Sequence, residues 1–137
     1  MEIKVNSCYE EEFFISDNLV QQFANLTGDI NPLHTDNEFV KKTKFGQRIA
    51  HGGILFGLLS RILGTKFPGG GTVYIYQNLN FLLPVYPNTK VKVMIKVKEV
   101  LPKFGVVLHQ QIWNSTGELV CEGEAKIKLP EWCMLKN

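Results

Sequence analysis

The sequence predicts an α+β fold in which an antiparallel sheet wraps around one hydrophobic helix. Two observations carry this prediction. Residues 49–64 are apolar around nearly the whole helical circumference, as expected of a helix that is buried. After residue 72 the chain consists of long segments with strand periodicity that are joined by short turns. Helices and strands that follow one another in separate runs are typical of α+β domains, and a curled sheet is an economical way to bury such a helix.

The N-terminal region predicts a strand followed by a helix. Residues 13–15 end the strand, and Ser16 can cap the helix. Gly28 is suited to end it, because glycine readily adopts the left-handed conformation of a helix C-cap. The apolar residues between these caps recur at helical spacing. They are Leu19, Val20, Phe23, Ala24 and Leu26.

A polar segment separates this helix from the hydrophobic one. Residues 29–35 contain Pro32 and other turn-forming residues, so we expect a loop there. Asp36 or Asn37 can cap a short helix that follows. Residues 41–48 have no periodicity and are expected to be irregular and exposed.

The hydrophobic helix contains several glycines, each of which weakens a helix by roughly 1 kcal/mol relative to alanine. They are Gly52, Gly53, Gly57 and Gly64. Glycines also let a strand or a ligand approach the helix backbone closely. The helix is expected to end before the glycine-rich loop at residues 67–71.

Four strands are expected after this loop. Residues 72–83 are rich in aromatic and β-branched side chains, and turns follow at residues 84–88, 102–105 and 114–117. The alternation is clearest in the second strand, where one face is apolar and the other carries lysines. The apolar positions are Val91, Val93, Ile95 and Val97, and the lysines are Lys90, Lys92, Lys96 and Lys98.

Length and composition favour one domain, spanning residues 1–137, that lies in a reducing compartment. The net charge is only +2 and no dense basic cluster stands out, so a nucleic-acid partner is not indicated. The three cysteines are widely spaced, which argues against a disulfide framework and a zinc site. The N-terminus lacks the pattern of a signal peptide, and the longest apolar stretch is shorter than the ~20 residues of a membrane span. We therefore expect a cytoplasmic protein with no membrane partner.

Asp29 and His34 are the first candidates for chemistry. They would diverge on a regular helix, but Pro32 breaks the helix and favours a loop that can bring them to one point. A carboxylate and an imidazole can hold one water between them, and histidine exchanges protons near neutral pH. Alternatively, Asp29 only completes the turn and His34 lies on the surface; composition alone leaves this reading open.

The second candidate is the start of the hydrophobic helix, at His51-Gly52-Gly53. The first N–H groups of a helix have no partner within it, and glycine leaves them accessible. Such donors can stabilise negative charge that develops on a substrate oxygen. Close packing of the helix end would explain the same glycines equally well.

Taken together, these motifs resemble the MaoC-like hydratases of the hot-dog fold, and especially the (R)-specific enoyl-CoA hydratases. The motif D-I-N-P-L-H at residues 29–34 and H-G-G at residues 51–53 carry most of the resemblance. Residues 77–85 resemble the family's strand, and residues 123–130 contain the G-E-A and L-P of its end. The resemblance therefore extends over nearly the whole chain after the first strand.

The resemblance implies a reaction and roles for particular residues. Asp29 and His34 correspond to the catalytic pair that activates water, and the Gly52 N–H corresponds to the donor that binds the thioester carbonyl. Three further residues are expected at the substrate site: Asn31, Ser60 and Gly53. Asn31 would orient the loop, and Ser60 corresponds to a hydroxyl near the site in related hydratases.

Other residues of chemical interest are given no catalytic part. His51 is interpreted as structural, and His109 and Cys121 as strand residues without a role. The resemblance implies a homodimer. Neither a metal nor an organic cofactor is expected, because the thioester carbonyl already activates the double bond.

The expected activity is reversible addition of water to trans-2-enoyl thioesters, which gives (R)-3-hydroxyacyl thioesters. The substrate is acyl-CoA or an acyl carrier protein thioester. Two alternatives stay open. One is a 3-hydroxyacyl-[acyl carrier protein] dehydratase of fatty acid synthesis, which runs the reverse reaction with the same residues. The other is a non-catalytic hot-dog protein that binds acyl thioesters.

Overall fold

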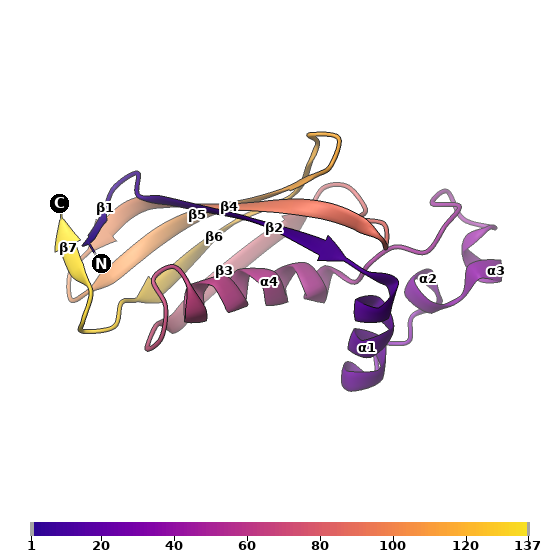
Figure 1. The fold of residues 1–137 in the computed structure, drawn as a ribbon, viewed down its shortest axis with the longest axis horizontal. Helices are drawn as coiled ribbons and strands as arrows, with labels where there is room; N and C mark the ends of the chain where they lie inside the picture. The colour runs from indigo at the N-terminus through magenta and orange to yellow at the C-terminus, as the bar shows by residue number, and fades with distance from the viewer. Residues whose placement is uncertain (1, 137) are drawn as a thin grey trace.

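The fold is a curved sheet with one long helix beneath it and three short helices at one end. The structure is a computed structural model that describes residues 2–136, so Met1 and Asn137 of the expected domain 1–137 lie outside the described residues. In Figure 1, α4 lies below the sheet, α1 to α3 gather beyond one end of it, and the two termini lie at the opposite end.

The main sheet is five-stranded and antiparallel, in the order β2-β4-β5-β6-β3. Its strands are β2 (Cys8–Ile15), β3 (Val73–Phe81), β4 (Thr89–Leu101), β5 (Gly105–Asn114) and β6 (Leu119–Lys128). The expected strands and turns are therefore confirmed. The sequence analysis missed a small parallel pair, β1 (Glu2–Lys4) with β7 (Met134–Lys136), because short strands from the two chain ends have no local signal.

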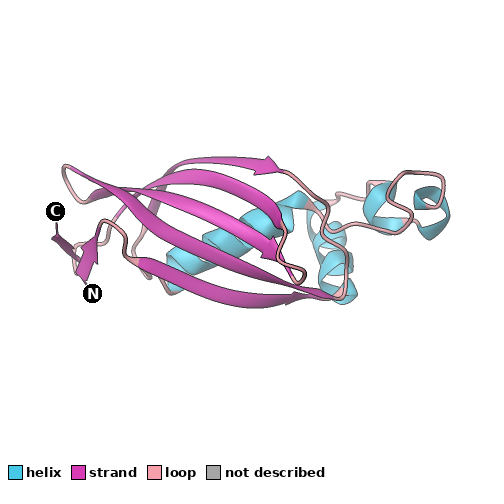
Figure 2. Ribbon diagram, turned by 90° about the horizontal axis from the view of Figure 1, so that it is seen from above, coloured by secondary structure: helices cyan, strands magenta, loops and turns pink. Residues whose placement is uncertain are grey.

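The hydrophobic helix is α4 (Gly52–Thr65), which runs diagonally beneath the sheet in Figure 2. It begins at Gly52, three residues later than predicted, because the backbone N–H groups of residues 49 and 50 are bonded to other segments of the chain. The Ile49 N–H donates to Leu33 O at 3.0 Å, and the Ala50 N–H donates to Val85 O at 2.7 Å. These bonds bring the start of α4 against two other parts of the chain.

The core lies between α4 and the inner face of the sheet. The buried helix residues are Ile54, Leu55, Leu59, Ile62 and Leu63. They pack with inward residues of the strands, which include Val91, Val93, Ile95, Leu108, Ile112, Ala125 and Ile127. The expectation that α4 is buried on all sides is wrong for this chain alone, because Phe56 is 40% exposed. The sheet covers only one side of the helix.

The first helix, α1 (Asp17–Thr27), has the caps that the sequence predicts. Ser16 Oγ accepts from the Leu19 N–H at 3.0 Å, and Gly28 ends the helix with a φ of 78°. Asp36 caps α3 (Asn37–Val40) through its side chain. None of the helices within residues 2–136 is long and apolar enough to span a membrane.

The segment 29–35 is not entirely a loop. Pro32 begins a single helical turn, α2 (Pro32–Thr35), which carries His34. The Asn31 side chain caps this turn by accepting from the Leu33 N–H at 3.0 Å. Proline suits the first position of a helix, where its missing N–H costs nothing and its φ is already helical. The prediction considered proline only as a helix breaker and so missed the helix that it starts.

Candidate active site

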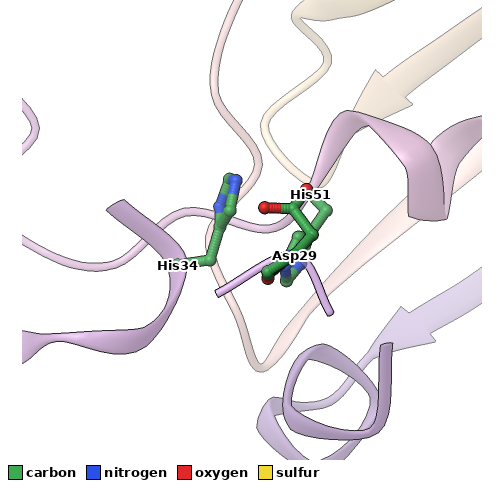
Figure 3. A group of neighbouring side chains, drawn as sticks. All are labelled: Asp29, His34 and His51. Atoms are coloured by element: carbon green, nitrogen blue, oxygen red, sulfur yellow. Dashed lines mark hydrogen bonds between the residues drawn. The ribbon is translucent and has the colours of Figure 1, made fainter. Parts of the chain in front are cut away.

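Three segments of the chain bring Asp29, His34 and His51 together (Figure 3). Asp29 follows the end of α1, His34 lies on α2, and His51 directly precedes the first residue of α4. One carboxylate oxygen and one ring nitrogen from each histidine all lie within 4.8 Å of one another. The structure thus brings Asp29 and His34 to one point, as expected, and adds His51 to them.

The turn between α1 and α2 positions Asp29. Gly28 reverses the chain direction, and the Asp29 N–H donates to Thr27 Oγ1 at 3.1 Å. The Asp29 carboxylate accepts one long hydrogen bond from the Asn31 N–H, at 3.4 Å. Asp29 is exposed, so its carboxylate remains available to accept a hydrogen bond from a bound water.

His34 is held in one tautomer by Ile49. Its Nδ1 lies 2.7 Å from Ile49 O, and because a carbonyl oxygen only accepts, Nδ1 carries the hydrogen. Nε2 is therefore an unprotonated acceptor in the neutral ring. Burial lowers the pKa of His34, the bond to Ile49 O opposes this effect, and His51 lowers the pKa further. The ring is therefore neutral at neutral pH and can accept a proton.

His51 contacts both members of the pair. Its side chain is buried, with 1% of its surface exposed. Its Nε2 lies 2.9 Å from the backbone oxygen of Asp29, so Nε2–H is the donor. Its ring centroid lies 3.9 Å from that of His34, with the ring planes tilted by 30°.

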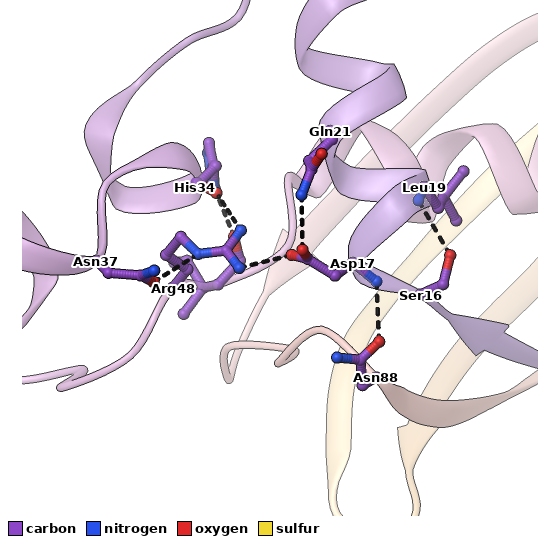
Figure 4. Close-up of polar contacts among 9 residues, drawn as sticks. Ser16, Asp17, Leu19, Gln21, His34, Asn37, Arg48 and Asn88 are labelled. Atoms are coloured by element: carbon purple, nitrogen blue, oxygen red, sulfur yellow. Dashed lines mark hydrogen bonds and ion pairs between the residues drawn. The ribbon is translucent and has the colours of Figure 1, made fainter.

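Arg48 ties α2 to its neighbours (Figure 4). Its guanidinium donates to His34 O at 3.2 Å and to Asn37 Oδ1 at 2.8 Å, and pairs with Asp17 Oδ1 at 2.6 Å. Gln21 donates to the other oxygen of Asp17 at 2.7 Å. The expectation that residues 41–48 are all exposed is wrong for Arg48, whose side chain is only 18% exposed. No local pattern signals this role, because its partners come from three helices.

His34 faces a cleft with a volume of about 760 Å³, which is in the usual range for small-molecule sites. The walls are mainly apolar, and Lys44 is the one charged side chain among the lining residues. The lining residues are His34, Lys44, Phe45, Ile49, Ala50, Gly52, Leu55, Phe81, Leu82, Leu83, Pro84, Val85 and Tyr86. A cleft of this kind suits a ligand with an apolar chain and a polar, reactive end.

Gly52 lies in this cleft at the start of α4. A Cβ at this position would be 2.8 Å from Cε1 of Phe81, so only glycine fits the observed ring position. The structure separates Gly53 from the cleft: a Cβ there would be 2.6 Å from Cζ of Phe23. Ser60 is about two turns further along α4 and does not line the cleft, and Asn31 acts as the cap of α2.

The three donors resemble a metal-ligand set in composition, since two histidines and one carboxylate often bind transition metals. The ring geometry does not suit a shared ion. A metal lies in the plane of each imidazole that binds it, at roughly 2.1 Å from the nitrogen. The rings of His34 and His51 lie with centroids 3.9 Å apart and planes tilted by 30°, an arrangement that does not favour one ion in both ring planes. The geometry suits a water held by Asp29 and His34 better.

Fold and site together define a hot-dog protein in which a carboxylate and two imidazoles gather where His34 faces an apolar cleft. Residues 3–114 match the MaoC like domain, and the chain belongs to this family. The structure of the (R)-hydratase from A. caviae superposes with a TM-score of 0.89 at 35% identity, and the match covers 93% of this chain and 98% of that one. These findings confirm the predicted fold and family.

Curated relatives of this family are named for adding or removing water. The 3-hydroxybutyryl-CoA dehydratase of Methylorubrum extorquens is 40% identical over 131 residues, covering 96% of this chain and 82% of the relative. The (R)-specific enoyl-CoA hydratase of Aeromonas caviae is 38% identical over 112 residues, covering 81% of this chain and 84% of the relative. A mitochondrial 3-hydroxyacyl-[acyl-carrier-protein] dehydratase of Arabidopsis thaliana is 31% identical over 139 residues, covering 98% of this chain and 82% of the relative.

Proposed function

We propose that this protein reversibly adds water to trans-2-enoyl-CoA thioesters to give (R)-3-hydroxyacyl-CoA. The observation that carries the proposal is the arrangement of Asp29 and His34, which brings a carboxylate oxygen and an imidazole nitrogen within 4.8 Å of each other where His34 faces an apolar cleft. A single water can donate one hydrogen to each acceptor. Its lone pairs are then directed away from the protein groups and toward the substrate.

His34 Nε2 is the base in this proposal, because Nδ1–H is already bound to Ile49 O. As the water oxygen bonds to C3 of the substrate, His34 takes one of its protons, and Asp29 holds the other hydrogen and stabilises the developing imidazolium. C2 then receives the proton from the same site. One water is consumed, a C3–O bond and a C2–H bond form, and the double bond becomes single.

The start of α4 complements this step. As water bonds to C3, the electron pair of the C2–C3 double bond moves toward C2 and the thioester oxygen, and the N–H of Gly52 is the donor proposed to stabilise the resulting negative charge. Asn31 supports the site by capping the α2 turn that carries His34. Because one side of the cleft supplies both the water and the proton, addition should be syn and give one enantiomer. The (R) configuration follows from the names of the relatives.

Coenzyme A is the proposed carrier. Relatives named for CoA thioesters are 35–40% identical to this chain, whereas those named for acyl carrier protein are 30–31% identical. Lys44 lines the cleft, and Lys42 is exposed two residues before it. Positive charge there suits the phosphates of a nucleotide carrier.

A homodimer is the proposed assembly. Strand β3 is an unpaired edge of the sheet, and it exposes Val73 by 55% and Ile75 by 62%. Phe56 of α4, 40% exposed, stacks on Tyr74 of this strand with centroids 5.8 Å apart. A second copy could continue the sheet at β3 and cover this apolar surface. Sedimentation of a fully active monomer at low concentration would contradict the dimer.

The proposed location is the cytoplasm. All three cysteines are free, two of them buried, as expected in a reducing compartment.

The proposal is tested by following the loss of ultraviolet absorbance as crotonyl-CoA is hydrated. Asp29→Asn and His34→Gln should each lower kcat by roughly 10²-fold or more. His109→Gln is the matched control, because His109 lies on β5 and contacts Glu122 rather than the site. Chiral analysis of the product should give only the (R) form. Wild-type rates in both folded site variants would refute the assignment, and a faster reaction with an acyl carrier protein thioester would refute the proposed carrier.

A further inference from the structure

We propose that His51 is a positioning residue that holds both Asp29 and His34 in their reactive geometry. This inference rests on the proposed function, since it concerns the same pair. His51 approaches one member through a hydrogen bond and the other through its ring face, and the two contacts use different parts of the imidazole.

The hydrogen bond fixes the Asp29 backbone. Asp29 lies in an exposed turn whose side-chain contact to the Asn31 N–H is long, at 3.4 Å. The bond of 2.9 Å from His51 Nε2–H to Asp29 O joins this turn to the start of α4. Because His51 is 1% exposed, water competes little for the carbonyl. The position of the carboxylate relative to Gly52 is thus set from the helix and not by the turn alone.

The ring contact fixes His34. The His51 ring lies against it at 3.9 Å between centroids, and on another side His51 contacts the ring of Phe23 at 4.7 Å. The Phe23 ring in turn occupies the space that a Cβ at position 53 would need, so this position requires glycine. Three aromatic rings are therefore packed in series from α1 to α2. This packing restricts the rotation of the His34 ring.

The chemistry of His51 itself argues for a role beyond packing. Its Nδ1 is buried and has no hydrogen-bond partner among the side chains that the structure describes. Buried polar atoms without partners are rare in native proteins and are unfavourable. Phenylalanine would supply the ring without this unfavourable atom, and glutamine would supply the N–H without the ring. Histidine provides both contacts from this position.

Two variants separate the contacts, measured with crotonyl-CoA on the full chain. His51→Gln keeps a donor for Asp29 O and loses the ring, whereas His51→Phe keeps the ring and loses the donor. Each should lower kcat by about 10- to 100-fold with a smaller change in KM, because misplacement of about 1 Å at the reacting atoms costs this much. His109→Gln and His109→Phe are the matched controls and should retain the wild-type rate.

The pH profile of kcat/KM gives a readout that a purely structural role would not move. The titratable groups that face the His34 ring are Asp29 from the α1–α2 turn and His51 from α4, while Arg48 bonds its backbone oxygen. His51 lowers the pKa of His34. The acid limb of the profile should therefore shift to higher pH in His51→Gln, and it should not shift in the His109 variants.

Folded His51 variants with wild-type kcat and an unchanged acid limb would overturn this inference. If Asp29→Asn and His34→Gln also kept full activity, the proposed function would fail as well, so the two failures are distinguishable. Nitrogen-15 NMR of the wild type covers the case in which the variants do not fold. His51 should show the Nε2–H tautomer and His34 the Nδ1–H tautomer at neutral pH; any other tautomer of His51 would refute its bond to Asp29 O.

Discussion

Gly52→Ala tests how closely the start of α4 approaches the reacting thioester. The added methyl carbon would be 2.8 Å from Cε1 and 3.0 Å from Cζ of Phe81. Carbon atoms in contact prefer about 3.5–4.0 Å, so the ring has to retreat by roughly 1 Å. Phe81 is 56% exposed and can turn outward, which keeps the effect on folding small.

The expected effects on stability and activity therefore differ. The strain should be about 1 kcal/mol or less, and it is partly offset because alanine is preferred to glycine in a helix by about 0.5–1 kcal/mol. Activity should suffer more, because the added methyl group enters the cleft beside the proposed N–H donor. Loss of one such donor lowers kcat by about 10²- to 10³-fold, and we expect a loss near the lower limit.

The assay is the hydration of crotonyl-CoA, with urea unfolding measured in parallel. Gly64→Ala is the matched control: no atom lies within 4 Å of a Cβ at Gly64 on the same helix, so this variant should keep its rate and gain about 0.5–1 kcal/mol. In a Gly52→Ala, Phe81→Leu double variant, the smaller side chain should restore part of the rate. A folded Gly52→Ala protein with a rate within twofold of wild type would show that the thioester does not contact this position.

Three further outcomes are expected. Since burial lowers the pKa of His34, kcat/KM should stay level as pH falls through about 6.5, the ordinary histidine value, and should decline only below it, when the base becomes protonated. Arg48→Met should lower kcat by about 10-fold and the free energy of unfolding by about 1–2 kcal/mol, because α2 loses its links to Asp17 and Asn37. Gly123→Ala should lower the free energy of unfolding by about 1–3 kcal/mol, because its Cβ would overlap the backbone oxygen of Asn78 on the paired strand β3.

Each of these outcomes has a result that contradicts it. A rate that rises as pH falls below about 6.5 would mean that His34 acts in its protonated form. An Arg48→Met variant with normal kcat would show that α2 holds His34 without this contact. Arg48→Lys keeps the positive charge but lacks the several N–H donors of the guanidinium, so it separates the two contributions. A Gly123→Ala protein as stable as wild type would mean that β3 and β6 are spaced more widely than the structure shows.

The sequence predicted those features that depend on local order. Alternation placed Val91, Val93 and Ile95 on the buried face of β4, and the structure has them there. Ser16 and Gly28 cap α1 as expected. Such features are readable because strand faces and helix caps depend on residues only a few positions apart.

Other features were decided by tertiary contacts. His51 could only be interpreted as structural, because its partners Asp29 and His34 are 17 to 22 positions away along the chain. The links of Arg48 to three helices, and the contact between Phe81 and Gly52, likewise join segments that have no common pattern.

The sequence by itself determined the fold class, the order along the chain of the five strands of the main sheet, and the candidate pair Asp29 and His34. Only the tertiary structure decided the tautomer of His34, the exposed side of α4 and the stack of rings behind the pair. The physical reason is that periodicity and helix caps depend on residues close together in the chain. Which nitrogen of the His34 ring keeps a free lone pair depends instead on which atom of a distant segment accepts a hydrogen bond from the other ring nitrogen. In this protein that atom is the backbone oxygen of Ile49, which no side-chain pattern can identify.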